Sequence, residues 1–241
     1  MSSLSFFKRE LRNYIWDILE NKGVSLPPKP IYNRIPNFKG ADKAAKIVTE
    51  TSAFRKATVI KIDPDSPLKH IRMQALVHGK TIVMPTPRLR KGFVIVNPNK
   101  IGYSKIEFAS TIRGAMILGE VVDNPYTIPE VDLFVVGCVA VSRINGVRLG
   151  KGGGFGDLEY AILLEAEKIT YDITIIALVH DLQVINRALP KDLHDVPVDL
   201  IATPTSLIKV LRRENRPRGI LCNKLSKEYA SLPIIRKLAK C

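Results

Sequence analysis

The sequence predicts a three-layer α/β fold built on a doubly wound, mostly parallel sheet. Runs of apolar and β-branched residues alternate along the chain with segments whose apolar residues recur at helical spacing. Some of these runs, such as residues 131–142 and 173–180, are apolar over most of their length, which is typical of strands covered by helices on both faces. We expect a single domain over residues 1–241, with an N-terminal helical extension over about 1–40 and a C-terminal tail over about 212–241.

The elements of the first half follow from this alternation. The first helix is predicted from apolar residues at helical spacing, namely Phe7, Leu11, Tyr14, Ile15 and Ile18. It should end near Gly23, ahead of the prolines of "LPPKP", and a second helix should begin at about Ala41. The next elements expected are a strand over 57–63, a helix over 66–79 and a strand over 80–86.

The second half repeats the pattern. The elements expected are a strand over 131–142, a helix over 157–169, a strand over 173–180, and a short strand followed by a helix within 197–212. The sequence contains no internal repeat and no low-complexity tract. The elements are therefore expected to form one sheet covered by helices.

The net charge of +14 is the unusual bulk property of this chain. A protein this basic attracts polyanions such as nucleotides, nucleic acids or polycarboxylates. However, the charge is spread along the chain, so it names no partner by itself. No apolar run is long enough to span a bilayer, and the N-terminal residues lack the pattern of a signal peptide. We therefore expect a cytoplasmic protein with no membrane partner.

The segment "RLGKGGGFGD", residues 148–157, lies between a predicted strand and a predicted helix, where open α/β sheets bind their ligands. Successive glycines let backbone amides turn toward one concavity, and such a nest binds phosphate oxygens. Lys151 adds a positive charge, and Arg148 can reach the same space with a fork of donors. These residues predict an anion site.

The glycines and other residues of these segments also have structural interpretations that involve no ligand. The segment does not end in the Gly-Lys-Ser/Thr of a Walker A loop, and a tight turn with positive φ is an alternative reason for its glycines. Asp157 is expected at the N-cap of the following helix, a position that favours aspartate without any metal. His194 and Asp195 are interpreted as residues that cap or orient the loop carrying Asp199.

The order of the motifs resembles that of a known family. The segments "DLFVVGCVAVSRINGVRLGKGGGFGD", "ALVHDLQVI" and "LPKDLHDVPVDLIATPT" are similar to the second half of the 5-formyltetrahydrofolate cyclo-ligase family, and Lys8 and Arg12 match its Lys-x-x-Leu-Arg arrangement. "RIPNFKGA", "DPDSPLKHIR" and "MPTPRLRKG" look closer still to the methenyltetrahydrofolate synthetase domain-containing branch. The RNA-recognition domain that animal members of this branch carry is absent from this sequence.

This resemblance implies an ATP- and Mg²⁺-dependent ligase that converts 5-formyltetrahydrofolate to 5,10-methenyltetrahydrofolate through a phosphorylated formyl oxygen. Lys8 and Arg12 would help to bind the triphosphate, and Arg148 and Lys151 would be catalytic. Asp157 and Asp199 would hold Mg²⁺. The remaining residues expected to bind ATP are Gly150, Gly152, Gly153, Gly154 and Phe155, with Asp157 beside them.

The folate half of the site departs from the family pattern. Phe155 and Gly156 replace the family's Tyr-Tyr, although the Phe155 ring could still stack on a pterin. Asp65 lies roughly where the family has a glutamate that contacts the pterin. The substrate is therefore expected to be 5-formyltetrahydrofolate or a modified pterin.

The alternative is a non-catalytic nucleotide- or RNA-binding protein on the same fold. The glycine-rich segment over residues 148–157 favours the enzyme, because an RNA-binding protein has no need of a site for a triphosphate. With 7% aromatic residues and no recognition motif, the chain also lacks the stacking residues that RNA modules usually display.

Overall fold

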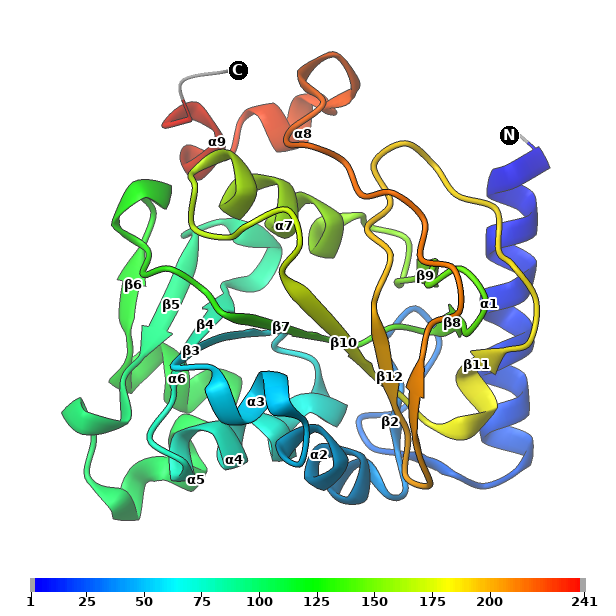
Figure 1. Cartoon of the computed structure of the whole chain (residues 1–241), viewed down its shortest axis with the longest axis horizontal. Coiled ribbons are helices and arrows are strands. Elements are labelled where there is room, and N and C mark those ends of the chain that lie inside the picture. The colour runs from blue at the N-terminus through cyan, green and yellow to red at the C-terminus, as the bar shows by residue number, and fades with distance from the viewer. Residues whose placement is uncertain (1–2, 239–241) are drawn as a thin grey trace.

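The computed structural model describes residues 3–238, which form a central sheet with helices on both faces (Figure 1). The eight strands, in spatial order, are β13 (Leu207–Lys209), β12 (Leu200–Ala202), β10 (Thr174–Leu178), β7 (Leu133–Val136), β3 (Val59–Ile62), β4 (Thr81–Pro85), β5 (Phe93–Val96) and β6 (Glu120–Val122). The strands from β12 to β4 run parallel, whereas β13, β5 and β6 pair antiparallel at the edges. The predicted doubly wound, mostly parallel α/β fold is confirmed.

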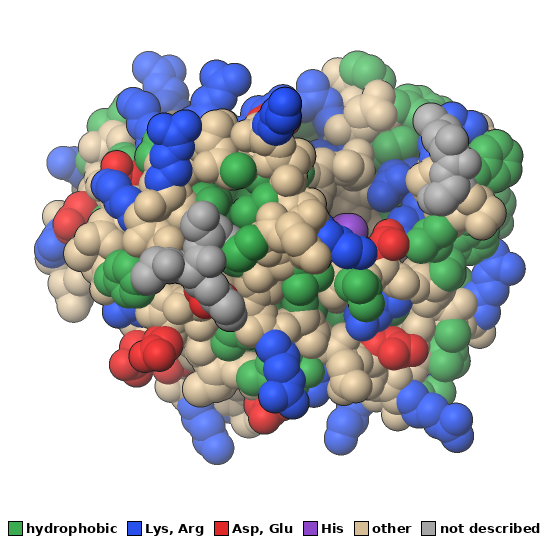
Figure 2. All heavy atoms as spheres, turned by 90° about the horizontal axis from the view of Figure 1, so that it is seen from above, with side chains coloured by type: hydrophobic (Ala, Val, Ile, Leu, Met, Phe, Trp, Pro, Cys, Tyr) green, Lys and Arg blue, Asp and Glu red, His purple; other side chains and the backbone are tan. Residues whose placement is uncertain are grey.

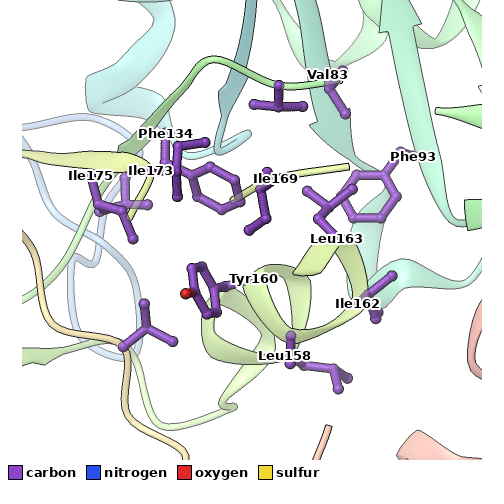
Figure 3. Packing of buried hydrophobic residues seen from close by; sticks show 14 of the residues in the cluster. Val83, Phe93, Phe134, Leu158, Tyr160, Ile162, Leu163, Ile169, Ile173 and Ile175 are labelled. Carbon is purple, nitrogen blue, oxygen red and sulfur yellow. The ribbon is translucent and has the colours of Figure 1, made fainter. Parts of the chain in front are cut away.

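Both faces of the sheet are buried, and β7 shows why its sequence is apolar throughout. Phe134 and Val136 pack in the cluster around α7 (Phe155–Glu165), where Tyr160 and Leu163 meet the sheet (Figure 3). The alternate residues of β7 pack in a second cluster on the opposite face. Burying each large apolar side chain stabilises the fold by roughly 1.5–3 kcal/mol, so a strand between two helical layers favours apolar residues at every position.

The helices are divided between these two faces. α2 (Ala41–Thr49) and α4 (Lys69–Val77) contact each other and cover the face opposite α7, as Figure 1 shows. The shorter helices are α3 (Ser52–Lys56), α5 (Ile106–Ala109), α6 (Ile112–Leu118), α8 (Lys227–Ala230) and α9 (Pro233–Arg236). Among the described residues, no helix combines the length and the apolar character that crossing a bilayer requires.

The first helix lies at one end of the sheet. α1 (Ser3–Asn21) ends two residues before Gly23, close to its predicted end. Its apolar stripe packs on a small sheet of β8 (Ala140–Ser142), β9 (Arg148–Leu149) and β11 (Val184–Ile185). A second small sheet joins β1 (Ser25–Leu26) to β2 (Asn37–Phe38). Because β9 leads into residues 150–154, called here the glycine loop, this packing brings α1 next to that loop.

The single strand predicted over residues 131–142 is wrong. β7 ends at Val136, and the chain then leaves the main sheet and continues as β8 in the small sheet. Gly137 marks the break: its amide donates to Asp63 Oδ2, and a Cβ there would lie 2.8 Å from Ile35 Cγ2. Uniform apolarity does not reveal this break, because the residues on either side of it are equally buried.

The helix predicted within residues 197–212 is also wrong. β12 is followed by a turn and by β13, which runs back antiparallel to it. Thr203 Oγ1 accepts hydrogen bonds from the amides of Thr205 and Ser206 and holds this turn. Residues 93–122, for which no element was predicted, contain β5, α5, α6 and β6.

The C-terminal segment packs on the core. Leu232, Ile234 and Ile235 belong to the same cluster as the buried face of α7, and α8 and α9 lie beside α7 in Figure 1. The division into one domain with extensions over 1–40 and 212–241 stays a prediction, and residues 1–2 and 239–241 lie outside the described part of the chain.

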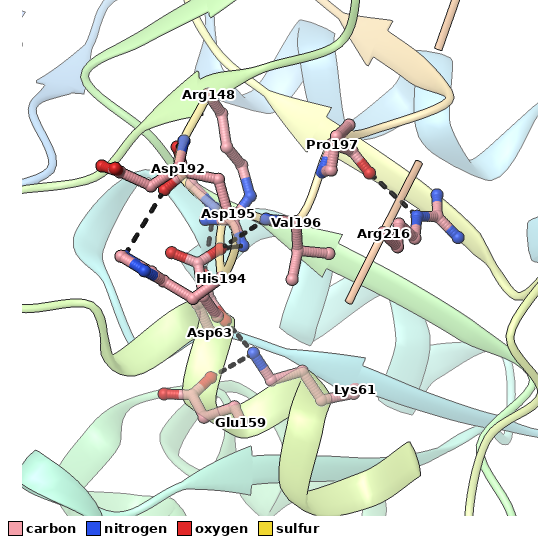
Figure 4. A network of polar contacts seen from close by, with 12 residues as sticks. Lys61, Asp63, Arg148, Glu159, Asp192, His194, Asp195, Val196, Pro197 and Arg216 are labelled. Carbon is pink, nitrogen blue, oxygen red and sulfur yellow. Dashed lines mark hydrogen bonds and ion pairs between the residues drawn. The ribbon is translucent and has the colours of Figure 1, made fainter. Parts of the chain in front are cut away.

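Asp199 fastens the amino ends of two neighbouring strands. Its Oδ2 accepts a 2.8 Å hydrogen bond from the Ile175 amide and pairs with the buried guanidinium of Arg216. Arg216 also donates to the carbonyls of Pro197 and Ile173, and Figure 4 shows the bond to Pro197. The carboxylate therefore neutralises a buried cation that has no contact with solvent through its side chain.

We predict that Asp199→Ala lowers the free energy of unfolding by about 3 kcal/mol, because the Arg216 charge stays buried without its carboxylate. Urea denaturation followed by circular dichroism measures this change. Asp172→Ala is the matched control: that carboxylate is 84% exposed and lies 3.8 Å from Arg213, so its removal should cost less than about 0.5 kcal/mol. Equal effects of the two substitutions would contradict the role given to Asp199.

Candidate active site

A cavity of about 960 Å³ opens at the carboxyl ends of the parallel strands. Asp63 follows β3, Gly137 follows β7, and both residues line the cavity. The chain winds from β3 to β4 in one direction and from β7 to β10 in the other, so the cavity lies where the winding reverses. Ligands of doubly wound sheets bind at such a point. Figure 2 shows a hollow on this side of the molecule, with a histidine and charged side chains at its rim.

The structure brings all but one of the sequence-predicted site residues to this cavity. Those that line it are Lys8, Arg12, Asp65, Arg148, Gly150, Lys151, Gly152, Gly153, Gly154, Phe155 and Asp157. Asp199 is the exception among them, and its position is treated below.

The glycine loop joins β9 to α7 and leaves room for a ligand against its backbone. A Cβ added at Gly150 would meet no atom within 4 Å, so this part of the loop is open. Gly152 and Gly154 have φ values of 103° and 67°, which glycine adopts without strain. Gly154 is the N-cap residue of α7, and the unpaired amides of a helix N-terminus attract anions.

The sequence predicted Asp157 as the N-cap of α7, and this prediction is wrong. The helix begins at Phe155, and Asp157 lies in its first turn. The reason is the left-handed conformation of Gly154, which turns the chain into the helix three residues earlier. The carboxylate of Asp157 is therefore free of a capping role and points to tertiary partners.

Those partners are Arg148 and the loop that precedes β12. Asp157 Oδ1 lies 2.9 Å from Arg148 Nη2 and accepts a 3.0 Å hydrogen bond from the Val196 amide. Burial raises the pKa of Asp157 above its ordinary value. The buried Arg148 Nε has no hydrogen-bond partner among the described residues. Arg148 therefore retains a donor that a phosphate oxygen could satisfy.

Two cations of α1 connect the helix to the cavity. Arg12 Nε donates a 2.6 Å hydrogen bond to the Gly150 carbonyl. Lys8 Nζ lies 2.7 Å from Asp192 Oδ2 and 2.6 Å from Asp195 Oδ2. A hydrogen bond from Lys8 lowers the pKa of Asp192. Helix α1 thus closes one side of the cavity with positive charge.

Two carboxylates and a histidine gather on this side of the cavity. Asp192, His194 and Asp195 offer ligand atoms within 4.8 Å of one another, a grouping that could hold a metal ion. The charge of Asp195 also acts on Asp157, because it helps to raise the pKa of that carboxyl. Oxygen ligands of this kind are those that Mg²⁺ prefers. The interpretation of Asp195 as a residue that orients its loop stays a prediction, and its Oδ2 accepts a 2.7 Å hydrogen bond from the Asp192 amide.

Asp199 does not join this group. It precedes β12 and so lies at the amino ends of the strands, whereas Asp157 and the cavity lie at the carboxyl ends. Its carboxylate pairs with Arg213 and Arg216 instead. The predicted Mg²⁺ pair of Asp157 and Asp199 is therefore not assembled in this fold, and Asp195 is the carboxylate that lies close to Asp157.

A buried group of charges forms the floor of the cavity. Lys61 is fully buried and bonds both Asp63 and Glu159, as Figure 4 shows. Asp63 Oδ2 also accepts a 3.2 Å hydrogen bond from the Gly137 amide, which ties β3 to β7. Burial raises the pKa of Glu159 to about 7. The floor is therefore charged and polar, although apolar strands surround it.

Asp65 and Lys151 face each other across the cavity entrance, with Asp65 Oδ1 3.2 Å from Lys151 Nζ. Burial raises the pKa of Asp65. The turn that carries this carboxylate is held by Arg72, whose Nη1 donates to the carbonyls of Asp63 and Asp65. Burial lowers the pKa of Arg72 to about 10, so it remains charged at neutral pH.

The last wall of the cavity is aromatic. The Phe155 ring meets the ring of Tyr229 edge-on, with 5.1 Å between centroids. The Arg88 guanidinium lies 5.7 Å from the Phe155 centroid. Phe155 therefore contacts both α8 and the turn that carries Arg88.

Comparison with known proteins decides the family. The sequence model of the 5-formyltetrahydrofolate cyclo-ligase family matches residues 5–204. The chain belongs to this family. The resemblance seen in the sequence is confirmed.

Curated relatives agree with this family assignment, and a solved structure shares the fold. The methenyltetrahydrofolate synthase domain-containing proteins of Danio rerio and Homo sapiens are 38% and 35% identical over 237 and 244 residues, in each case 96% of this chain. The chain spans 61% of the length of each. An NMR structure of Aquifex aeolicus 5,10-methenyltetrahydrofolate synthetase is 20% identical, has a TM-score of 0.53, and covers 90% of this chain and 99% of its own. It shares the fold.

Several residues of this cyclo-ligase-family cavity were missed by the sequence analysis. His194 and Asp195 carried a signal, because they are adjacent polar residues in a segment that also resembles the family. Glu159 and its buried partner Lys61 gave no signal, because the spacing of a charge inside an apolar strand or helix does not assign it to a cavity. Tyr229 lies beyond the residues that the family model matches.

We predict that the pH dependence of stability reports the buried Glu159. Its pKa is about 7 in the folded protein and 4.5 ordinarily, so the folded state holds an extra proton between these values. Stability should therefore fall as pH rises from about 4.5 to 7, by up to about 3 kcal/mol from this group. Urea unfolding of Glu159→Gln should show a correspondingly flatter profile.

Glu120→Gln serves as the control for this comparison, because the Glu120 side chain is 65% exposed. Its profile between pH 5 and 8 should follow that of the unsubstituted protein. If Glu159→Gln also follows that profile, the folded protein does not hold the extra proton at Glu159.

Proposed function

We propose that this protein catalyses the ATP- and Mg²⁺-dependent conversion of 5-formyltetrahydrofolate to 5,10-methenyltetrahydrofolate. The observation that carries the proposal is the meeting of an open glycine loop with both cations and carboxylates in one cavity. Family membership supports the choice of reaction. A protein that bound only RNA would have no use for carboxylates gathered beside the glycine loop, because carboxylates repel polyanions.

The residues present fit a magnesium ion and a triphosphate. Asp157, Asp192 and Asp195 supply oxygen ligands of the kind that Mg²⁺ prefers. The buried Nε of Arg148, without a partner among the residues described, supplies a donor that awaits an acceptor. Mg²⁺, when bound, would neutralise the negative charge that develops on the phosphate oxygens.

The chain's own groups have distinct tasks in the proposed reaction. The loop amides and Lys151 bind the triphosphate, while Lys8 and Arg12 add positive charge from α1. Arg148 stabilises the phosphoryl group as it moves from ATP to the formyl oxygen of the folate, and ADP departs. The folate nitrogen N10 then bonds to the formyl carbon, and inorganic phosphate departs with the formyl oxygen.

The folate would occupy the remaining part of the cavity. Asp65 offers a carboxylate to the polar edge of a pterin, and Phe155 offers a ring for stacking. The charged floor at Asp63 and Glu159 adds acceptors for amino groups. A pterin has both a planar face and donor-rich edges, so these surfaces suit either the ordinary folate or a modified one.

We predict that Lys151→Ala lowers kcat/KM at least about 100-fold, because it removes a charge from the transferring phosphate. The absorbance of methenyltetrahydrofolate follows product formation from 5-formyltetrahydrofolate, ATP and Mg²⁺. Lys100→Ala is the control, since Lys100 is 70% exposed and lies away from this cavity. The proposal is wrong if the unsubstituted, folded protein forms no product and binds no ATP.

We also predict that Asp195→Asn raises the Mg²⁺ concentration needed for half-maximal activity by about tenfold or more. Asp199→Asn should leave this requirement unchanged, because Asp199 lies at the other end of the strands. The measurement is a magnesium titration of the same assay, run at a temperature where both variants are folded. A larger effect of Asp199→Asn would instead support the metal site at Asp157 and Asp199 that the sequence predicted.

A further inference from the structure

A segment outside the family match builds one wall of the cavity. The family model ends at residue 204, yet Lys224, Leu225 and Tyr229 all line the cavity. This wall faces the glycine loop, and Tyr229 comes from the short helix α8. The site therefore has a component that the family pattern does not include.

This wall is fixed to the rest of the molecule. Ile220, Leu232 and Ile234 are buried in the cluster that surrounds α7. Arg88, whose guanidinium lies by the Phe155 ring, also forms an ion pair with Glu228, the neighbour of Tyr229. Tyr229 thus holds a defined position over the cavity.

The hydroxyl of Tyr229 lies at the end of the glycine loop. It is 3.5 Å from the point that a Cβ of Gly154 would occupy, and Gly154 is the N-cap residue of α7. Among the described residues, the hydroxyl has no hydrogen-bond partner. Burial raises the pKa of Tyr229, so the hydroxyl keeps its proton at neutral pH and can donate it in a hydrogen bond.

A phosphate oxygen is the acceptor that suits this donor. The loop amides and the N-terminus of α7 attract an anion to the space beside Gly154. Asp65, which faces Lys151, and the carboxylates of the floor belong to other walls of the cavity. A phenol hydroxyl at the N-terminus of α7 would meet an anionic ligand before it met the polar edge of a pterin.

We propose that Tyr229 donates a hydrogen bond to a phosphate oxygen of the nucleotide bound on the glycine loop, so that the C-terminal segment completes the phosphate site. This inference rests on the proposed nucleotide-dependent function. It makes Tyr229 a binding residue of this chain that the family-matched part, residues 5–204, does not supply.

Tyr229→Phe isolates the hydroxyl, because the phenylalanine ring keeps the packing on Phe155. Calorimetry should show ATP–Mg²⁺ bound about tenfold more weakly, since a hydrogen bond to a charged group is lost. Inorganic tripolyphosphate, a probe with no nucleoside, should lose affinity by a similar factor. The melting temperature without ligand should not change.

Tyr103→Phe is the matched control: the residue is 78% exposed and does not line the cavity. Its ATP and tripolyphosphate affinities should equal those of the unsubstituted protein. Binding of 5-formyltetrahydrofolate should be unaffected by either substitution. Weaker folate binding by Tyr229→Phe with unchanged ATP binding would overturn the inference and assign the hydroxyl to the folate.

Failure of this inference is distinct from failure of the proposed function. If the unsubstituted protein binds ATP, Lys151→Ala loses that binding and Tyr229→Phe retains it in full, only the role of Tyr229 is wrong. If the unsubstituted protein binds neither ATP nor tripolyphosphate, the nucleotide site itself is wrong, and the inference falls with it.

Discussion

The carboxylate of Asp63 joins the two strands between which the winding of the sheet reverses, and the cavity depends on this junction. One oxygen accepts the Gly137 amide at the end of β7, and the other pairs with the buried Lys61 of β3. Lys61 in turn reaches Glu159 on α7. Strand ends and helix are thereby fixed around a polar floor, and the chain after Gly137 is directed into the small sheet that carries the glycine loop.

Most charges of the cavity are already paired. The pairs are Arg148 with Asp157, Lys8 with Asp195, and Lys151 of the glycine loop with Asp65 across the cavity entrance. Such pairs avoid the cost of burying single charges. A metal–triphosphate complex would replace both partners of such a pair, because phosphate oxygens suit the cations and the metal suits the carboxylates. The site is thus electrostatically balanced without its ligand and complementary to a ligand of mixed charge.

The fold and the glycine loop were predictable because both depend on local patterns. Apolar runs and helical spacing identified the main strands and α7, and successive glycines identified the loop. The errors arose where tertiary contacts overrode the pattern. Gly137 breaks an apolar run by packing against Ile35, and Thr203 holds a hairpin where apolar residues suggested a helix. Neither contact has a counterpart in the spacing of apolar residues.

The sequence by itself determined the fold class, the family motifs and the glycine loop with Lys151 and Arg148, since each is written in neighbouring residues. Only the tertiary structure decided which carboxylate accompanies Asp157. Asp195 and Asp199 are four residues apart, but residues 196–198 lead the chain from the cavity to the amino end of β12, where Arg216 is buried. The wall that contains Tyr229 was likewise decided by long-range packing on α7, because no local pattern brings residue 229 to residue 154.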